Sequence, residues 1–535
     1  MSSRLDAAHP QTVPGTPHFR PAIHYTARKT WLNDPNGLVF FGGFYHLYYQ
    51  NNPYDNVWGN MSWAHATSTD LVHWTEHGVA IPCDEAEDIY SGSIVVDRAN
   101  TSGFGTATNP PLVAVYTSAF KDGSPHRGTQ AQSLAYSNDG GMTWSKYAGN
   151  PVLSRGTPHF RDPKVFEYSG PRGSWWVMVV VEAQEQKVVI YRSTNLRDWE
   201  PASEFGPANA VGGESGAGEW ECPDLFPLAV DEDPANTKWV LVVNLNPGAV
   251  AGGSGGQYFV GDFDGVTFAP DPSCLVDMPQ SNDGAALRKC LWLDWGRDYY
   301  AAVSFSNVPD NRRLMIGWLN NWDYANSLPT DPWRSGMSLV REVRLETIEG
   351  HPRLVQMPIL PAAGTETEGA FALERLELRD GALQLPDAVP GMAQVIDVEV
   401  LPGSAQRIGF RLLGASDGGA GTILSYDTAT GELTLDRRNS GNTDFHPKFA
   451  SVETAPVVLD PVGLDPLGPD PVASLEGGAL KLRIVVDHCS VEVFAQGGRV
   501  VMSDLVFPDA GSLATSFFVD GGKAVIRKLT VSDVS

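Results

Sequence analysis

The feature that most limits how this chain can fold is a turn that recurs four times in its first half. Each copy is a short polar or glycine-containing stretch that ends in an aromatic, at residues 68–74, 137–144, 193–199 and 261–268. Each follows a short alternating or apolar run, the pattern of a strand entering a hairpin. The closing aromatics lie 70, 55 and 69 residues apart, at Trp74, Trp144, Trp199 and Phe268. This spacing is typical of large repeated units, and convincing helical periodicity is absent.

A polar motif precedes each of these turns. Asp34 lies 40 residues before the first closing aromatic, Ser91 53 before the second, Asp162 37 before the third and Glu221 47 before the fourth. If the units are blades of a β-propeller, this register places each motif on the same strand of its blade, so that their side chains converge on the central axis. A fifth unit would run through residues 294–301 and 313–318, and an N-terminal strand is a candidate to close it.

Length and pattern predict an all-β chain with two domains. A chain of 535 residues is too long for one ordinary core. We expect a five-bladed β-propeller over residues 20–347 and a connector over 348–369. Short alternating runs such as 394–400 and 482–486 predict a β-sandwich over 370–535. Within it, three Asp-Pro pairs at 460–461, 465–466 and 470–471 mark a proline-rich insertion that we interpret as a surface loop.

The charge balance narrows the possible partners. The net charge is -25, from 38 basic and 63 acidic residues. Binding to nucleic acid or to an anionic membrane needs a basic surface, so both are excluded as expected partners. A neutral ligand such as a sugar fits better. The 15 tryptophans, 16 tyrosines and 22 phenylalanines are mostly core residues by type, but aromatic rings are also the side chains on which sugars stack.

The five cysteines are too few and too scattered for a disulfide scaffold or a zinc cluster. Cys83, Cys222 and Cys489 are interpreted as buried thiols, and Cys274 and Cys290 are candidates for one bridge. We expect no metal and no cofactor, because no His/Cys cluster suggests a metal site.

Glycine-rich stretches and the start of the chain carry weaker signals. Residues 212–218 and 248–256 are rich in glycine, but neither is followed by a helix with a lysine in place, so both are interpreted as long rim loops rather than phosphate sites. The first 19 residues lack an apolar signal-peptide core, and no run of about 18 apolar residues occurs. Taken at face value this predicts a cytoplasmic protein, although a secreted enzyme without its leader would look the same. The oligomeric state is left open.

Three short motifs combine carboxylates with aromatics and proline: residues 31–37 (WLNDPNG), 159–164 (HFRDPK) and 219–224 (EWECPD). Taken alone, each motif has a purely structural interpretation, since Asp-Pro-Asn-Gly is a common turn sequence and Arg-Asp-Pro could be a surface ion pair. Together they indicate one acid-lined pocket, in which Asp34 is the leading candidate nucleophile.

In this order the three motifs resemble the family-32 glycoside hydrolases, which include invertases, inulinases and levanases. Further matching stretches occur at 44–50 (FYHLYYQ), 63–66 (WAHA), 90–93 (YSGS), 298–301 (DYYA), 317–326 (GWLNNWDYAN) and 487–494 (DHCSVEVF). The resemblance covers nearly the whole chain. It implies that the C-terminal sandwich has a structural role.

The resemblance also implies roles for single residues. Asp34 matches the nucleophile that forms a covalent fructosyl-enzyme, Glu221 the general acid and base, and Asp162 the residue that binds ring hydroxyls and stabilises the transition state. In a retaining enzyme the two reacting carboxyls lie roughly 5 to 5.5 Å apart. The residues that match positions holding the terminal fructose are Asn33, Gln50, Trp58, Ser91, Arg161, Tyr300 and Trp318, with Trp58 and Trp318 as apolar walls.

The local sequence agrees with these roles. The fixed charge of Arg161 is expected to keep Asp162 ionised, whereas Trp220 and Cys222 are expected to surround Glu221 and favour its protonated form. An ionised binder and a protonatable acid are the pair that the reaction needs.

The expected function is release of terminal non-reducing β-D-fructofuranosyl residues from sucrose or fructans, by a retaining, exo-acting hydrolase. Residues 319–330 most resemble the exo-acting members of the family. A fructosyltransferase would use the same residues, and a non-catalytic sugar-binding propeller would have no reason to keep all three acids. The order of preference among sucrose, inulin and levan depends on rim loops and is left open.

Overall fold

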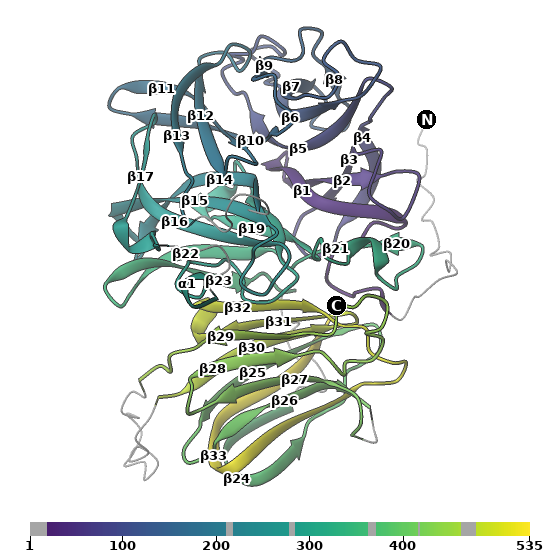
Figure 1. Cartoon of the computed structure of the whole chain (residues 1–535), viewed down its shortest axis with the longest axis vertical. Helices are drawn as coiled ribbons and strands as arrows, with labels where there is room; N and C mark the ends of the chain where they lie inside the picture. Colours follow the sequence, from purple (N-terminus) through teal and green to yellow (C-terminus); the bar gives the residue numbers. More distant parts are fainter. Residues whose placement is uncertain (1–18, 210–217, 278–283, 362–370, 416–417, 462–477) are drawn as a thin grey trace.

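A computed structural model of the chain describes residues 19–209, 218–277, 284–361, 371–415, 418–461 and 478–535. Two β-domains are stacked end to end, with a propeller above a sandwich in Figure 1. The predicted fold class, an all-β five-bladed propeller followed by a β-sandwich, is confirmed.

In each of the first three blades, strands that follow one another in the sequence pair antiparallel in one sheet. They comprise β1 (Thr30–Phe41), β2 (Phe44–Asn52), β3 (Ser62–Ser68) and β4 (Thr75–Ile81); β5 (Glu87–Val96), β6 (Leu112–Phe120), β7 (Gln130–Ser137), β8 (Ser145–Lys146) and β9 (Leu153–Ser154); and β10 (Phe160–Gly170), β11 (Gly173–Glu182), β12 (Lys187–Ser193) and β13 (Glu200–Phe205).

The last two blades share one continuous sheet, because β14 and β22 are joined by a parallel pair between Val230 and Leu345. Their strands are β14 (Glu219–Val230), β15 (Asp233–Asn246), β16 (Gly255–Phe263), β17 (Phe268–Pro270), β18 (Tyr300–Ser304), β19 (Leu314–Leu319), β21 (Gly336–Met337), β22 (Arg341–Ile348) and β23 (His351–Pro358). Strand β20 (Trp333–Arg334) follows β19 in the sequence but pairs with β1 in the sheet of the first blade. Short helices interrupt them at η2 (Pro272–Cys274), α1 (Gly284–Leu287), η3 (Pro309–Asn311) and η4 (Ala325–Ser327).

The outer part of the fifth blade differs from the sequence expectation in two ways. Strand β23 pairs with β22 along its whole length, so residues 351–358 of the predicted connector belong to the sheet of the propeller. The N-terminal strand β1 does not complete the fifth blade but begins the first. The ring closes instead through β20, which runs parallel to β1, and through a parallel bridge between Val39 and Ser306.

The four repeated turns are confirmed as hairpin connections between the third and fourth strands of blades one to four. They join β3 to β4, β7 to β8, β12 to β13 and β16 to β17. In the first, the Asp70 carboxylate accepts hydrogen bonds from the backbone N–H of Val72 and His73. In the fourth, Asp264 does the same for Val266 and Thr267. Short polar side chains therefore accept the hydrogen bonds of the backbone N–H groups in these turns, which explains why the same turn sequence recurs.

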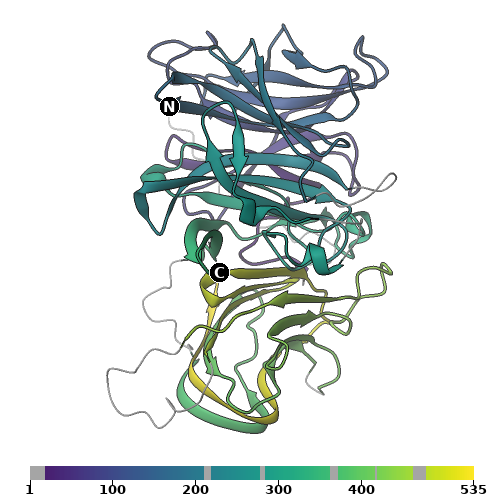
Figure 2. The same ribbon diagram turned by 60° about the vertical axis from the view of Figure 1, so that its left-hand side comes forward.

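The C-terminal domain is the expected sandwich, folded from one long sheet (Figure 2). Its elements are β24 (Phe371–Gln384), β25 (Ala393–Leu401), β26 (Arg407–Gly414), β27 (Thr422–Asp427), β28 (Glu432–Asp436), β29 (Val452–Pro456), β30 (Leu480–Asp487), β31 (Ser490–Ala495), η5 (Gln496–Gly498), β32 (Val500–Leu505) and β33 (Ala514–Val534). The 21-residue β33 pairs with β25 through one half and with β26 through the other, so it passes from one layer to the next.

The two domains are joined by backbone and by buried charges. The N–H groups of Trp295 and Asp298 donate to carbonyls of Val501 and Ser503 at 2.8 and 2.9 Å. Five buried residues form an ionic group that we call the interdomain cluster: His24, Asp294, Arg341, Asp487 and Glu492. These bonds hold the sandwich against the propeller, so the two domains are not joined merely by a flexible linker.

The candidate bridge between Cys274 and Cys290, left open by the sequence, does not form, since all five cysteines are free. Cys274 bonds the backbone of Val260, and the Cys290 thiol donates to the carbonyl of Ala286 at 3.7 Å. Cys222 and Cys489 are buried as expected, whereas Cys83 is only half-buried.

Two sequence expectations fall largely outside the described residues: most of the first glycine-rich stretch, at 212–217, and the Asp-Pro pairs at 465–466 and 470–471. The second glycine-rich stretch leads into β16, not into a helix. Among the described residues, no helix has the length and apolar character to span a membrane. In the same part of the chain, no group of three or more His, Cys, Asp or Glu side chains is placed to hold a metal ion.

Candidate active site

The first strand of every blade carries one polar motif, as the repeat register predicts. Strands β1, β5, β10, β14 and β18 contact one another in a ring around the propeller axis. Each of these strands slips in register against its neighbour at the motif itself, between Leu32 and Pro35, Tyr90 and Gly92, Arg161 and Lys164, Glu221 and Asp224, and Tyr300 and Val303. Bulges of this kind bend a strand and redirect its side chains. Five aligned bulges therefore turn polar side chains towards one point.

Three residues in these bulges have a left-handed backbone that side chains rarely adopt: Asp162 (φ 65°), Cys222 (φ 43°) and Ala301 (φ 51°). Hydrogen bonds between blades hold them there. The N–H of Asp162 donates to the Thr117 hydroxyl at 2.8 Å, and the N–H of Cys222 donates to the Asp162 carboxylate at 2.9 Å. Strained backbone that neighbouring blades enforce is typical of functional sites.

Asp34 is fixed by a chain of side-chain hydrogen bonds. Ser91 donates to one carboxylate oxygen at 2.6 Å, and Asn33 donates to the other at 2.9 Å. Gln50 in turn donates to the Ser91 hydroxyl at 2.6 Å, and the Trp31 indole donates to Asn33 at 2.7 Å. Burial and the nearby charge of Glu221 raise the pKa of Asp34, while the bonds from Ser91 and Asn33 oppose that rise. The carboxylate is thus oriented, with its ionised form supported by two donors.

Asp162 lies beside Asp34 but has less support for its charge. Burial, followed by the charges of Glu221 and Asp34, raises the pKa of Asp162 to about 7 against the opposing effect of Arg161. The nearest approach between the Arg161 guanidinium and the Asp162 carboxylate is 3.9 Å. Arg161 favours the ionised form of Asp162, as expected, but burial and the neighbouring carboxylates outweigh it, because this guanidinium is directed mainly at two other carboxylates.

Those two carboxylates are Glu221 and Glu219. Arg161 donates to Glu221 from Nη2 at 3.0 Å and from Nε at 3.2 Å, and its Nη2 also makes a short contact with Glu219. The Tyr300 hydroxyl makes a short hydrogen bond to the second oxygen of Glu221. The Glu221 side chain remains 23% exposed, so it can reach a molecule in the cavity.

Glu221 is not surrounded by its sequence neighbours, contrary to expectation. Successive side chains of a strand point to opposite faces. Trp220 accordingly packs into the core against Phe205 and Phe259. The Cys222 thiol lies 3.6 Å from the Asp34 carboxylate and 3.7 Å from that of Asp162. The environment of Glu221 is therefore set by Arg161 and Tyr300 from other blades.

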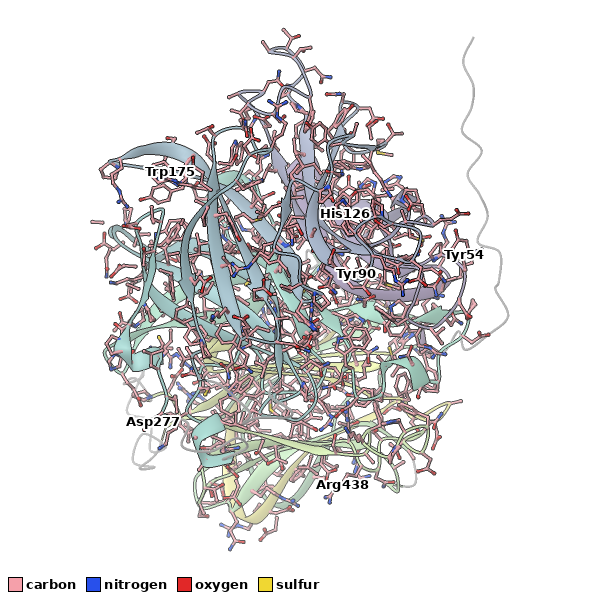
Figure 3. All side chains as sticks on the ribbon, turned by 45° about the horizontal axis from the view of Figure 1, so that its top comes forward. Tyr54, Tyr90, His126, Trp175, Asp277 and Arg438 are labelled. Atoms are coloured by element: carbon pink, nitrogen blue, oxygen red, sulfur yellow. The ribbon has the colours of Figure 1, made fainter. Side chains whose placement is uncertain are left out.

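These groups open into a cavity of about 420 Å³, and one of its lining residues, Tyr90, is labelled in Figure 3. Its lining comprises Asn33, Asp34, Gln50, Trp58, Tyr90, Gln130, Pro158, His159, Arg161, Asp162, Glu219, Glu221 and Trp322. Seven of the ten sequence-derived site residues line it directly. Ser91 and Tyr300 hydrogen-bond to the acids from the sides, so the structure brings nine of them together.

The tenth, Trp318, is not the cavity wall that the sequence suggested. Its side chain is fully buried, and its indole donates to the Leu32 carbonyl at 3.1 Å. Trp322, whose ring lies 4.8 Å from that of Trp318, lines the cavity instead. Trp58 is 42% exposed and meets Tyr90 edge to face, so the expected aromatic wall exists on that side.

Sequence reasoning missed six lining residues: Tyr90, Gln130, Pro158, His159, Glu219 and Trp322. The spacing held a usable signal for two of them. Glu219 precedes Glu221 by two positions on one strand, which places both on the same face, and His159 precedes Arg161 by the same interval. Gln130 begins the third strand of its blade and has no motif to mark it.

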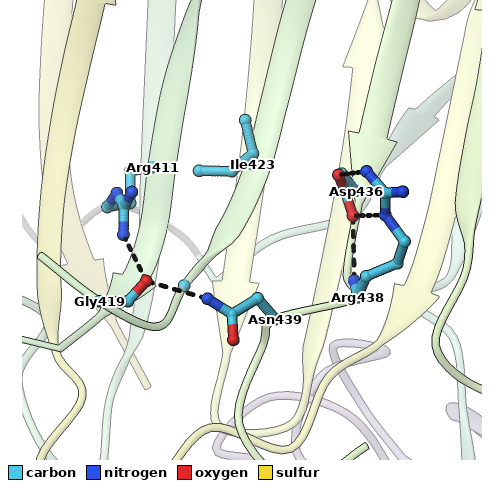
Figure 4. A pocket seen from close by; sticks show the side chains of 7 residues that line it. Arg411, Gly419, Ile423, Asp436, Arg438 and Asn439 are labelled. Atoms are coloured by element: carbon cyan, nitrogen blue, oxygen red, sulfur yellow. Dashed lines mark hydrogen bonds and ion pairs between the residues drawn. The ribbon is translucent and has the colours of Figure 1, made fainter.

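A second hollow, of about 370 Å³, lies on the sandwich (Figure 4). Its only carboxylate, Asp436, is paired with Arg438 at 2.6 Å, and Asn439 and Arg411 bond the Gly419 carbonyl. In the propeller cavity, by contrast, Asp34, Asp162, Glu219 and Glu221 face one space, so this cavity is the candidate active site.

A propeller whose axis carries two adjacent aspartates and a reachable glutamate has the parts of a glycoside hydrolase. The family models agree: the "Glycosyl hydrolases family 32 N-terminal domain" matches residues 24–358, and the "Glycosyl hydrolases family 32 C terminal" matches residues 370–533. The chain belongs to this family and is an enzyme that hydrolyses glycosidic bonds.

Similar proteins support this assignment. The chain is 43% identical over 519 residues to a levanase of Bacillus subtilis, covering 96% of this chain and 70% of that one. It is 37% identical over 541 residues to an extracellular exo-inulinase of Aspergillus niger, covering 97% and 95%. The crystal structure of exo-inulinase from Aspergillus awamori superposes with a TM-score of 0.85 at 36% identity, over 97% of this chain and 98% of that chain.

Proposed function

We propose that this enzyme releases terminal non-reducing β-D-fructofuranosyl residues from sucrose and from fructans such as levan and inulin. The observation that carries the proposal is the convergence of Asp34, Asp162 and Glu221 from three blades on one cavity. The names of the relatives, levanase, exo-inulinase and invertase, support a fructoside as substrate. A neutral sugar also suits a protein with a net charge of -25.

In the proposed mechanism Asp34 attacks the anomeric carbon of the fructosyl unit while Glu221 protonates the departing oxygen. The covalent fructosyl-enzyme is then hydrolysed by a water molecule from which Glu221 removes a proton, so that the anomeric configuration is retained. The hydrogen bonds from Ser91 and Asn33 aim the Asp34 carboxylate for attack. Tyr300 and Arg161 hold Glu221 at the side of the leaving group.

Asp162 supports the transition state without making a bond to the sugar. Its carboxylate lies beside Asp34, linked to it through the Cys222 thiol. Negative charge at this point stabilises the oxocarbenium-like centre as positive charge develops there. The buried negative charge of Asp162 is stabilised most when the sugar carries positive charge, which happens only in the transition state. Asp162 therefore stabilises the transition state more than the bound substrate.

The remaining cavity residues hold the terminal fructose. Asn33, Gln50 and Ser91 offer amide and hydroxyl groups to ring hydroxyls, and Trp58 and Trp322 provide aromatic walls. Gln50 lines the cavity beside Asp34 and is hydrogen-bonded to it through Ser91. The resemblance of residues 319–330 to exo-acting members of the family, and the exo-inulinases among the relatives, favour exo-acting release over internal cleavage.

Two other functions would use the same cavity. A fructosyltransferase differs only in that a second sugar, rather than water, accepts the fructosyl group. A sugar-binding module would gain nothing from three clustered acids, of which Asp34 and Asp162 are buried and Asp162 has a strained backbone, since their charges cost stability. We therefore place hydrolysis first.

Products formed from sucrose, inulin and levan, separated by chromatography after short digests, test this function. Release of fructose alone from both polymers supports the exo-acting hydrolase, whereas an early ladder of oligosaccharides would show internal cleavage. Carbon NMR in the first minutes should detect β-fructofuranose, and initial α-anomer would contradict the double displacement. A transfer fraction above half at millimolar sucrose would move the assignment to the transferase.

A further inference from the structure

Glu219 is a second glutamate at the mouth of the active site. It lies two residues before Glu221 on β14, so both side chains project from one face of the strand into the same cavity. Its side chain is 32% exposed, against 23% for Glu221. The proposed mechanism leaves it without a role.

The contacts of Glu219 converge on Arg161. One carboxylate oxygen makes a short contact with Arg161 Nη2, the same nitrogen that donates to Glu221 at 3.0 Å. The other oxygen accepts a hydrogen bond from Gln184 at 3.1 Å and lies 3.7 Å from His159 Nδ1. Burial opposes its ionisation, but the hydrogen bond and charge of Arg161 lower the pKa of Glu219. Glu219 is therefore a fixed anion anchored from two sides.

This arrangement bears on a conflict in the chemistry of Glu221. The acid must hold a proton until it gives that proton to the leaving oxygen, yet its carboxylate accepts two hydrogen bonds from a guanidinium. A cation at such a distance strongly favours the ionised form of a carboxyl group. A second carboxylate on the same guanidinium neutralises that cation, and its own charge repels a charge on Glu221.

We propose that Glu219 is a positioning residue, which shares Arg161 with Glu221 and thereby leaves Glu221 able to hold the proton for the leaving group. This inference rests on the proposed function. Glu219 acts through Arg161 and is not required to touch the sugar. Its partner Gln184 keeps the carboxylate turned towards the guanidinium.

Other ionisable groups face the same cavity, and they stay unchanged when Glu219 is substituted. They are Asp34 on β1, Tyr90 on β5, Asp162 on β10, Cys222 on β14, Tyr300 on β18 and His159 immediately before β10. Glu219 differs from these groups because it contacts the Arg161 guanidinium, which also binds Glu221. Its removal should thus affect the protonated acid more than the ionised nucleophile.

The test is the pH dependence of kcat/KM on sucrose for wild type, Glu219→Gln and Glu219→Asp. The alkaline limb of this profile reports loss of the proton from the essential acid of the free enzyme. In Glu219→Gln it should move to lower pH by about 1 unit, while the acid limb stays in place. Glu219→Asp keeps the charge and should restore part of the shift. Glu204→Gln, which removes an exposed partner of Arg155 in the neighbouring blade, is the matched control and should leave both limbs unchanged.

A second substrate sharpens the test. Nitrophenolate departs without protonation, so kcat/KM on p-nitrophenyl β-fructofuranoside should fall less than threefold in Glu219→Gln at pH 7. On sucrose it should fall about tenfold, since a sugar alkoxide needs the acid.

Two outcomes would overturn the inference. Coincident alkaline limbs for Glu219→Gln and wild type, or equal losses on both substrates, would make Glu219 a sugar contact or a structural residue. If wild type released no fructose from sucrose, the proposed function would fail as well. With active wild type and coincident limbs, only the role of Glu219 would fail.

Discussion

The active site and the interdomain cluster both contain buried carboxylates, yet the pKa values of Asp487 and Glu492 in the cluster and of Asp162 in the active site shift in opposite directions. In the cluster, His24 lies 2.8 Å from both Asp487 and Glu492, and Arg341 lies 2.8 Å from Glu492 and 2.9 Å from Asp294. Despite burial, hydrogen bonds and charge from His24 lower the pKa of Asp487 to about 2. Burial likewise opposes the ionisation of Glu492, but Arg341 and His24 lower its pKa to about 2.

In the active site one arginine, Arg161, is shared by three carboxylates, and the pKa of Asp162 rises to about 7. Burial is similar in the two regions, so the ratio of cations to acids decides the outcome. Paired charges in the cluster stabilise the contact between the domains. Unpaired charges in the cavity cost folding stability and are available for chemistry.

Removing a reacting carboxylate should give the largest effect on turnover and almost none on folding. We expect Asp34→Ala and Glu221→Ala to lower kcat on sucrose by about 10⁴- to 10⁶-fold, because both groups are proposed to make or break bonds in the transition state. Thermal melts followed by circular dichroism should match wild type or lie above it. Appreciable turnover by the Asp34 variant would remove it as the nucleophile.

The opposite result is expected in the interdomain cluster. Arg341→Met leaves Asp294 without its cation and Glu492 with His24 alone, which should lower the free energy of unfolding by about 3–5 kcal/mol. Chemical denaturation measures this loss. kcat per folded molecule should stay near wild type, since the cluster lies outside the cavity. A stable variant with impaired kcat would show that the two regions are coupled.

Asp162→Asn should change turnover and folding stability in opposite directions. The amide keeps the shape but lacks the charge, so kcat should fall about 10²- to 10³-fold with a modest change in KM. A carboxyl whose folded pKa is raised contributes stability below its unfolded value near 3.8, and this stability is lost as the pH rises through about 7. The variant should therefore melt higher than wild type at pH 8, with a smaller difference at pH 4. A raised KM with unchanged kcat would make Asp162 a uniform binder.

The smallest effect is expected in the pH dependence of stability. Burial opposes protonation of His24, but its bonds to Asp487 and Glu492 raise its pKa from 6.5 to about 9. Its contribution is complete below pH 6.5 and disappears as the pH rises through 9, while those of Asp487 and Glu492 are complete above about pH 4.5 and disappear as it falls through 2. Between pH 6.5 and 9 the free energy of unfolding of the wild type should therefore fall, and His24→Gln should make this fall smaller by about 1–3 kcal/mol.

Urea unfolding across this range provides the measurement. His126→Gln, a change at an exposed loop histidine labelled in Figure 3, is the control. An unchanged alkaline slope in His24→Gln would mean that His24 does not carry a proton in the folded protein.

The sequence by itself determined the propeller, the strand that bears each motif and the acids that line the cavity. These features follow from local rules, since turn residues and strand alternation act within a few positions. Asp34, Asp162 and Glu221 could be named because each lies in a short motif at a fixed place in its repeat.

Only the tertiary structure decided which groups those acids meet. Arg161 adjoins Asp162 in the sequence but bonds Glu219 and Glu221 from another blade. Trp322 replaces Trp318 at the cavity wall, and β23 extends the last blade into the expected connector. The physical reason is common to all three: adjacent side chains on a strand face opposite ways, and contacts across blades depend on bulges and packing that no local pattern encodes.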